Sequence, residues 1–293
     1  MRSNTVGTFV GIIGGLAFMA APPSVSATEI NLTTMNADSG SAPVVSQSGD
    51  TFYVVQIPDQ TTGTGVIDPF LRLQANGDES GYNTSLGTPL DDKGGPFTRS
   101  LLLSEVPVVG LTLDDGTHNY YQFMLDINQN SGSDHELLSL NQIQIFQASS
   151  DQLYNASTAA ASGTSAVIGF PSATEVFRMS GNSGGGDVYL QILLNYALNA
   201  GSGSGDMFLY LRTDAFSADP NLDQVILFSQ FGTENGTHAS NDGFEEWAVI
   251  KANTQPCIGC DATVVPEPGS LLLLGSGLSL AAARLRRRRV VRS

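Results

Sequence analysis

Basic residues are scarce in most of this chain of 293 residues, and the few present are unevenly placed. Of the 13 lysines and arginines, Arg2 lies near the start and six arginines lie between residues 284 and 292, which leaves six for residues 28–265. The same segment holds 27 acidic side chains, so its formal charge is −21. A body so negative repels phosphate backbones, which excludes nucleic acid as its partner.

Residue types that bind metals or carry redox chemistry are also few. The chain has 2 cysteines, 3 histidines and 1 tryptophan, and only 14% of its residues are charged. If residues 120–127 and 137–146 pair as a hairpin, His118 and His135 lie on the order of 25 Å apart at the usual strand rise. They then cannot share a zinc ion. His238 could join only one of them, and two histidines are too few for a zinc site.

Helical periodicity is missing from the body of the chain. Short alternating or β-branched runs, separated by glycine, asparagine and aspartate, predict about ten strands. The expected strands are Thr51–Ile57, Val66–Ala75, Arg99–Leu113, Tyr120–Ile127, Leu137–Phe146, Glu175–Met179, Val188–Leu194, Met207–Arg212, Gln224–Phe231 and Phe244–Ile250. They predict an all-β fold, a single antiparallel β-sandwich of jelly-roll-like architecture over residues 28–252. Residues 153–165 fit either a short helix or an insertion.

The first residues predict a secretory signal peptide, residues 1–27. Arg2 precedes an apolar run over residues 6–21, and small residues follow two prolines before the expected cut between Ala27 and Thr28. This pattern is typical of Sec export followed by signal peptidase cleavage. The alternative is an uncleaved N-terminal anchor.

The other end has three parts after a linker of residues 253–265: Pro266-Glu267-Pro268, the largely apolar residues 269–283, and six arginines from Arg284 to Arg292. The two prolines hold an extended stretch that a processing enzyme can read. The apolar part is shorter than the ~20 residues that cross a bilayer core comfortably, so we expect a short hydrophobic helix inserted only transiently. The arginines then stay in the cytoplasm.

This tail, residues 266–293, resembles the PEP-CTERM sorting signal of Gram-negative bacteria, in which Pro266, Glu267 and Pro268 match the recognition motif. The resemblance implies export, transient retention in the inner membrane, and removal of the tail by exosortase, a membrane protease-transpeptidase. It also implies delivery to the cell surface or to an exopolysaccharide matrix, which makes polysaccharide a candidate partner. The alternative is an ordinary C-terminal anchor.

Strings in the body are similar to those of an uncharacterised, β-rich group of PEP-CTERM exported proteins. They are GTGVIDPFLRLQ (63–74), GYNTS (81–85), LLLSEVPVV (101–109), FMLDINQ (123–129), LLSLNQIQIF (137–146) and DGFEEWAV (242–249). Since that group has no known activity, the similarity supports one β-rich domain and implies no reaction.

One loop places oxygen-bearing side chains at alternate positions. They belong to Asp126, Asn128, Asn130, Asp134 and Glu136. Hard oxygen ligands suit calcium, so we predict a calcium site here with Asp126 as its anchor. The loop is not an EF-hand, because its glycine is one place late and its twelfth position is leucine. The alternative is a polar turn whose side chains cap their own backbone.

Two further motifs have structural explanations. Ser183 sits in a G-x-S-x-G string, but none of the histidines has the sequence context of a serine protease, and a glycine-rich hairpin turn explains the same residues. Cys257 and Cys260 form a C-x-x-C, which in an exported chain is more typical of a small disulfide loop than of a redox site.

Neighbouring Glu245 and Glu246 point to opposite faces of a strand, so they cannot be the facing carboxylates of a glycosidase, and Trp247 is expected to pack in the core. We therefore predict a non-enzymatic surface or matrix protein with a structural or binding role and no cofactor apart from calcium. The alternatives are a secreted hydrolase, either a serine protease or a glycosidase, and a carbohydrate-binding module. The module is favoured if Tyr82, Tyr120, Tyr121 and Trp247 form an exposed row.

Overall fold

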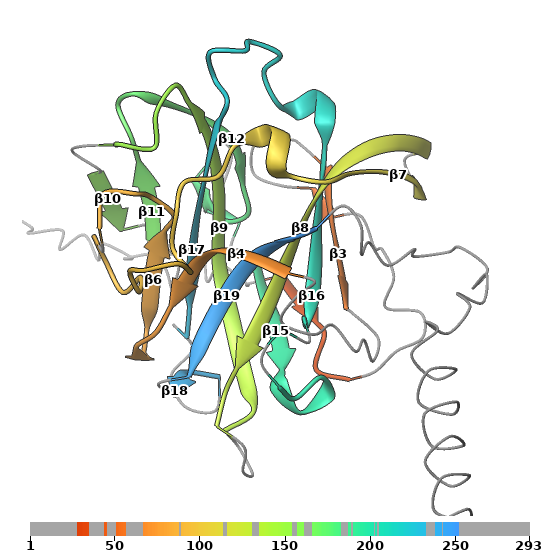
Figure 1. Ribbon diagram of the computed structural model, residues 1–293. Coiled ribbons are helices and arrows are strands. Elements are labelled where there is room, and N and C mark those ends of the chain that lie inside the picture. The colour runs from red at the N-terminus through yellow and green to blue at the C-terminus, as the bar shows by residue number, and fades with distance from the viewer. Residues whose placement is uncertain are drawn as a thin grey trace, which may run out of the picture. The chain divides into compact units, whose positions relative to one another are not determined.

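A computed structural model describes most of the residues between 28 and 251 (Figure 1). The described ranges are 28–34, 44–45, 51–56, 67–87, 89–113, 116–130, 135–153, 157–160, 166–182, 187–188, 190–201, 203, 205–232, 238–241 and 243–251. Within them the chain forms strands and single turns of 3-10 helix, and no α-helix. The predicted signal peptide, the cysteine pair, the sorting tail and Ser183 lie outside the described residues.

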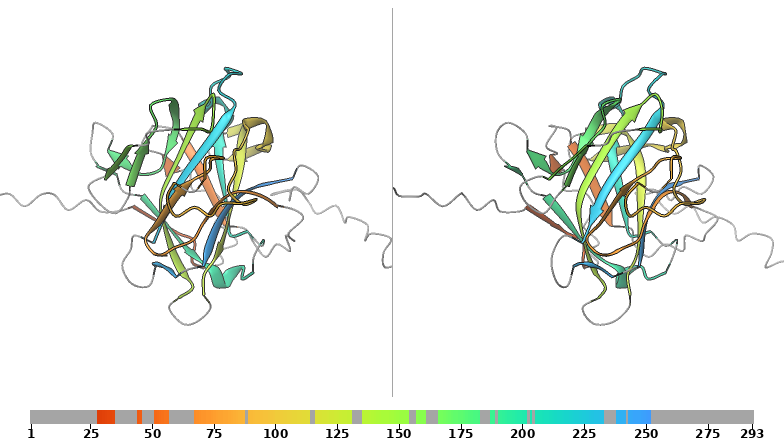
Figure 2. Two further views of the ribbon diagram at one scale, coloured as in Figure 1. Left: turned by 60° about the vertical axis from the view of Figure 1, so that its left-hand side comes forward. Right: turned by 90° about the vertical axis from the view of Figure 1, so that its left-hand side faces the viewer.

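The first sheet has six strands and is built around β9. Its order is β1 (Thr28–Asn31), β15 (Leu190–Asn195), β9 (Leu137–Ala148), β17 (Gln224–Phe231) and β6 (Glu79–Tyr82), and β12 (Ala173–Arg178) also pairs with β9. Figure 2 shows β9 and β17 side by side. The pair β1–β15 is parallel, so this sheet is not purely antiparallel as the sequence predicted.

The second sheet has seven strands, and all of its pairs are antiparallel. Its order is β2 (Val44–Val45), β3 (Thr51–Gln56), β16 (Met207–Arg212), β8 (Gly116–Asn128), β19 (Phe244–Ile250) and β4 (Ile67–Leu73), and β7 (Val108–Leu113) also pairs with β8. The long strands of both sheets are those that the sequence predicted.

The predicted strand Arg99–Leu113 is shorter in the structure. Its first half instead contains the 3-10 turn η1 (Leu103–Glu105). The Glu105 carboxylate accepts the backbone N–H of Leu102 at 2.7 Å, which closes this turn. Pro107, which has no N–H to donate, separates the turn from β7.

Short elements complete the fold. They are β5 (Asn76–Gly77) with β18 (Ser240–Asn241), β10 (Ser157–Ala160) with β11 (Ala166–Gly169), β13 (Gly181–Asn182) with β14 (Asp187–Val188), and the 3-10 turns η2 (Tyr196–Leu198) and η3 (Thr213–Ala215). The sequence fitted either a short helix or an insertion at residues 153–165. The part of this segment that the structure describes contains strand β10. The pairing of β13 with β14 brings together the segments on either side of Ser183.

The connection from β8 to β9 is not a hairpin. β8 pairs with β16, β19 and β7 in the second sheet, whereas β9 pairs with strands of the first. The hairpin assumed for residues 120–127 and 137–146 is therefore wrong, and the separation of His118 and His135 inferred from it has no basis. Local hydropathy cannot distinguish a hairpin from a crossing between sheets, because both need two apolar strands and a polar loop.

The two sheets pack face to face around the main hydrophobic core. Inward side chains of the first sheet, such as Ile143 and Leu227, meet those of the second, such as Leu125 and Trp247. The indole N–H of Trp247 donates to the hydroxyl of Ser229 across the gap at 3.0 Å. This arrangement confirms a sandwich of two main sheets and the prediction that Trp247 is a core residue.

The outer faces of the two sheets are also buried. On the first sheet, Tyr82, Phe146 and Ile226 form a second cluster with Phe170, which follows β11, and with neighbours. The second sheet carries Tyr53, Tyr120, Phe208, Tyr210 and neighbours in a third. Strands of this kind bury side chains on both faces, which explains why β9, β17 and β19 contain so few exposed residues.

Buried side-chain amides attach the loops to the first sheet. Four of them, here called the amide clamps, each donate to a backbone carbonyl and accept from a backbone N–H of the same loop or strand. They are Asn83 on Val225 and Leu227, Gln142 on Ser180, Gln144 on Ile168, and Gln147 on Ser217. Each clamp reproduces the paired N–H and C=O contacts of a β-ladder.

Replacing a clamp should destabilise the fold strongly. In Gln142→Leu the buried N–H and C=O of Ser180 both lose their partner, and each such group costs about 1–3 kcal/mol. We expect the free energy of unfolding in urea to fall by about 2–4 kcal/mol. The control Gln152→Leu alters an exposed glutamine and should stay within about 0.5 kcal/mol of the wild type. Equal effects of the two substitutions would contradict the role of the clamp.

Candidate functional site

Asp126, the predicted calcium anchor, is fully buried near the end of β8. Its two carboxylate oxygens accept the backbone N–H groups of Gly203 at 2.6 Å and Gly205 at 3.2 Å. Both glycines have positive φ angles of 84° and 70°, a conformation that favours glycine. Asp126 thus holds the turn that leads into β16.

The other predicted calcium ligands lie at several places. Asn128 is half-buried at the end of β8, and Asp134 lies outside the described residues. Asn130 donates its backbone N–H to the Asn241 side-chain oxygen at 2.9 Å and its side-chain N–H to the Asn241 carbonyl at 2.8 Å. The carbonyl of Glu136 accepts the N–H of Tyr196. In the part of the chain that the structure describes, no three Asp, Glu, His or Cys side chains gather as a metal site, and calcium in this loop stays a prediction.

Two glutamates from opposite sheets meet inside the sandwich. Glu79 comes from β6 in the first sheet, and Glu245 comes from β19 in the second. Both are at least 99% buried, and their carboxyl groups lie next to each other. Gln129, which follows β8, donates its side-chain N–H to Glu245 Oε1, and the backbone N–H of Ala75 donates to Glu79 Oε2 at 2.6 Å.

This carboxyl pair lies in an unfavourable place for charge. Burial raises the pKa of Glu245 well above its ordinary value, and the neighbouring Glu79 raises it further. Burial also raises the pKa of Glu79, although its polar neighbours Glu245, Ala75 and Ser240 oppose that shift. Asp206, whose pKa is raised well above its ordinary value by burial, adds a further repulsive contribution to Glu245.

Glu246 faces the opposite way, as the sequence predicted for adjacent residues of a strand. Its carboxylate forms an ion pair with Arg72 of β4. The guanidinium of Arg72 lies over the rings of Phe97 and Phe244, 3.4 Å and 4.3 Å from their centroids. These cation–π contacts fix the arginine over the buried carboxylate.

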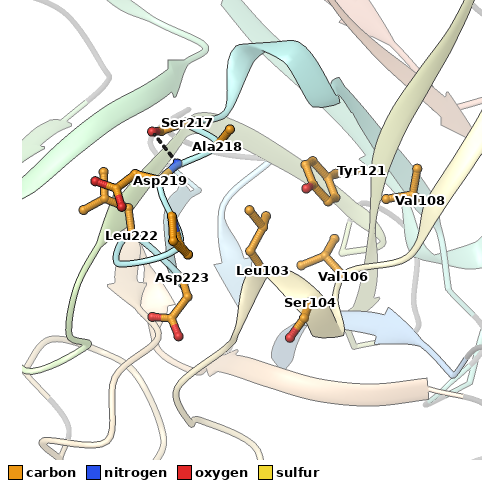
Figure 3. A pocket seen from close by; sticks show the side chains of 11 residues that line it. Leu103, Ser104, Val106, Val108, Tyr121, Ser217, Ala218, Asp219, Leu222 and Asp223 are labelled. Atoms are coloured by element: carbon orange, nitrogen blue, oxygen red, sulfur yellow. Dashed lines mark hydrogen bonds between the residues drawn. The ribbon is translucent and has the colours of Figure 1, made fainter.

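The aromatic residues considered for sugar binding do not form an exposed row. Tyr82, Tyr120 and Trp247 are buried, and only Tyr121 is half-exposed. Tyr121 lines an open hollow between η1, β7 and the loop of residues 217–223 (Figure 3). Leu103, Val106, Val108, Pro220 and Leu222 make its apolar walls, and Ser104, Ser217, Ala218, Asp219 and Asp223 complete it.

The histidines lie on different elements. His118 is on β8, where its Nε2 lies 3.5 Å from a guanidinium nitrogen of Arg212. His135 precedes β9, and its carbonyl accepts the side-chain N–H of Asn241 at 2.6 Å. The carbonyl of His238 accepts the backbone N–H of Ser139 at 3.0 Å. The predicted structural role of Ser183 stays a prediction, since that residue lies outside the described ranges.

Comparison with known proteins bears on the tail. Residues 264–289 match the family model of the PEP-CTERM protein-sorting motif. The chain carries a PEP-CTERM sorting motif. The match includes Pro266, Glu267 and Pro268, the apolar segment and the first five arginines, as the sequence predicted, and such a motif implies processing by an exosortase.

No curated protein and no solved structure matches the chain. Within the residues that the structure describes, no helix has the length and apolar character to span a membrane.

The ion pair of Arg72 and Glu246 gives a testable consequence. Arg72→Met keeps an apolar stem between the two rings but leaves the buried Glu246 without a cation. We expect a loss of about 2–3 kcal/mol in the free energy of unfolding at pH 7, below the full range for buried pairs because Arg72 is 19% exposed. Burial already raises the pKa of Glu246, and Arg72 opposes this shift.

The loss should depend on pH. Without Arg72 the folded-state pKa of Glu246 rises further above its unfolded value, so the penalty is present at neutral pH. It should shrink as the pH falls through the raised folded-state pKa of Glu246 and be largely gone by about pH 4, where the folded-state carboxyl is protonated with or without Arg72. The control Arg178→Met removes the half-exposed pair with Glu175 and should change stability by less than about 1 kcal/mol. Equal losses at both sites, or a loss independent of pH, would refute the assignment.

Proposed function

We propose that this is an exported protein of the cell surface or an exopolysaccharide matrix, with a structural or binding role and no enzymatic activity. In this proposal Sec exports the chain, signal peptidase cuts between Ala27 and Thr28, and the tail inserts transiently into the inner membrane as a short hydrophobic helix. An exosortase-like enzyme then removes the tail. The sandwich, jelly-roll-like in architecture, is the part delivered.

The observation that carries this proposal is the PEP-CTERM match over residues 264–289. The charge distribution supports it, because an acidic body is followed by an arginine-rich end. Arginine at the centre of a bilayer is unfavourable by roughly 2.5–3.5 kcal/mol on insertion scales, so the arginine block opposes complete translocation. A weak span with such a block suits temporary retention.

Processing of the tail can be tested by intact-mass measurement of the extracellular protein. We expect a product that ends near Pro266, Glu267 and Pro268 and lacks the apolar segment and the arginines. Glu267→Ala should leave full-length protein in the inner membrane. The control Asp261→Ala, which removes an acidic residue outside the motif, should be processed like the wild type. Surface-exposed protein that retains residues 271–284 would overturn the proposal.

One observation favours a more specific role, the binding of polysaccharide at the hollow beside Tyr121. This tyrosine packs edge-on against Phe216, with ring centroids 4.7 Å apart, which holds its ring in place. Val108 at the hollow is 50% exposed, and serine hydroxyls lie beside the apolar surface. An aromatic ring with nearby apolar and hydroxyl groups can contact both the faces and the hydroxyls of a sugar.

Affinity electrophoresis in gels that contain the host's own polysaccharide tests this role. Tyr121→Ala should weaken retardation by about tenfold, since the ring supplies the main contact surface and about 1.4 kcal/mol corresponds to tenfold. Tyr121→Phe keeps the ring and should bind nearly as well. Melting temperatures of both variants separate lost binding from lost folding. Equal retardation of the alanine variant and the wild type would exclude the hollow as the binding site.

A further inference from the structure

Three buried oxygen atoms at the carboxyl pair have no hydrogen-bond donor. They are Glu79 Oε1, Gln129 Oε1 and Glu245 Oε2. The residues that carry them are 1%, 3% and 0% exposed. Buried polar atoms in native proteins almost always have a partner, so three orphaned acceptors at one place need an explanation.

These acceptors belong to one cluster. Gln129 donates its amide N–H to Glu245, and the carboxyl group of Glu245 lies next to that of Glu79. The unpartnered oxygen of Gln129 is independent evidence for a missing ligand. Gln129 is uncharged, so repulsion between acids does not explain why its oxygen has no donor. Among the described residues, Gln129 directs its side-chain N–H to Glu245, and Ala75 directs its backbone N–H to Glu79. The hydroxyl of Ser240, which lies near Glu79, donates to the carbonyl of Ala75.

Charge points in the same direction. No arginine or lysine pairs with Glu79 or Glu245 among the described residues, and the nearest acidic groups, Asp206 and Asp91, repel them. Arg72, on the adjacent strand β4, forms its ion pair with Glu246 on the other face of β19. Two buried carboxylates carry a charge of −2, which one divalent cation neutralises.

We propose that Glu79, Gln129 and Glu245 form a calcium site that joins the two sheets of the sandwich. All the donors are hard oxygens, with no imidazole or thiolate, and carboxylate and amide oxygens of this kind suit calcium. Main-chain carbonyls or water would supply the remaining ligands. The site differs from the loop site predicted from the sequence, because it uses Gln129 from that segment together with residues far away in the chain.

The position of the site explains what the cation would do. Glu79 lies beside Phe231 in the first sheet, and Glu245 lies beside Ile127 and Leu73 in the second. A cation bound to both glutamates would therefore connect β6 to β19 at one end of the core. Binding to the folded state alone raises its stability, so calcium removal should loosen this end first.

Calcium content and melting temperature test the proposal on protein purified from its native host. We expect about one calcium ion per chain by elemental mass spectrometry. Relative to protein in EDTA, calcium at about a hundred times the dissociation constant should raise the melting temperature by roughly 5–10 °C. Terbium, which replaces calcium, should emit when Trp247 is excited, because residues two apart on a strand lie about 7 Å from each other on the same face.

Isosteric variants locate the cation. Glu245→Gln and Glu79→Gln should lose both the terbium emission and the response to calcium. The control Asp134→Asn, which alters a carboxylate of the loop, should keep both. If the glutamine variants fail to fold, the calcium content of the wild type and its melting temperature in EDTA still decide the matter.

Two outcomes would overturn the proposal. Wild-type protein without calcium, with the same melting temperature in calcium and in EDTA, would show that the two carboxyl groups share a proton instead. A response to calcium that disappears in Asp134→Asn and persists in Glu245→Gln would place the cation in the loop of residues 126–136.

Discussion

The pairing of buried side-chain amides with loop backbone is the interaction on which the rest of the fold depends. A loop laid over a sheet brings N–H and C=O groups that cannot reach water, and each must find a partner. Here Gln142, Gln144, Gln147 and Asn83 supply both a donor and an acceptor. Ionic side chains would need counter-charges that the base-poor body lacks, whereas amides satisfy the backbone without adding charge. The clamps thus allow residues such as Ile168 and Phe170 to cover the first sheet.

The same shortage of bases determines how the buried acids are accommodated. Asp126 uses two backbone N–H groups, Glu246 uses the arginine between two rings, and Asp206 accepts the N–H of Ile127 at 2.7 Å. Each of these carboxyl groups therefore has a donor directed at it by the fold. Glu79 and Glu245 differ, since one oxygen of each has no such donor. This contrast separates these three acids from the carboxyl pair; the buried Asp92 also has one oxygen without a partner.

Strand positions could be predicted from the sequence, but their assignment to sheets could not. Alternating and β-branched residues identified the segments of β3, β4, β8, β9, β16, β17 and β19, because a strand long enough to cross the core carries its own pattern. Two-residue strands such as β5 and β18 have no such pattern. The crossing from β8 to β9 was missed because tertiary packing, which leaves no local pattern in the sequence, determines which strands pair. Glu79 and Glu245 are distant in sequence, so their contact could not be predicted. The sequence could have shown only that Glu245 is a buried acid, because it lies on the same inward face of its strand as Trp247 and Val249.

Charge composition also connects the folded domain with the proposed sorting route. Arginine and lysine determine which segments stay in the cytoplasm, whereas acidic residues contribute little to that choice. A body with six bases and 27 acids can therefore be exported without conflicting with an arginine-rich tail that must remain inside. Glu246 has Arg72 as its partner, but Asp126, Asp206, Glu79 and Glu245 must be satisfied inside the sandwich without a lysine or arginine paired to them. Neutral amides, glycine N–H groups and, at the carboxyl pair, a cation taken up outside the cell meet this need, so the same scarcity of bases that suits the chain for sorting accounts for the hydrogen bonds inside its fold.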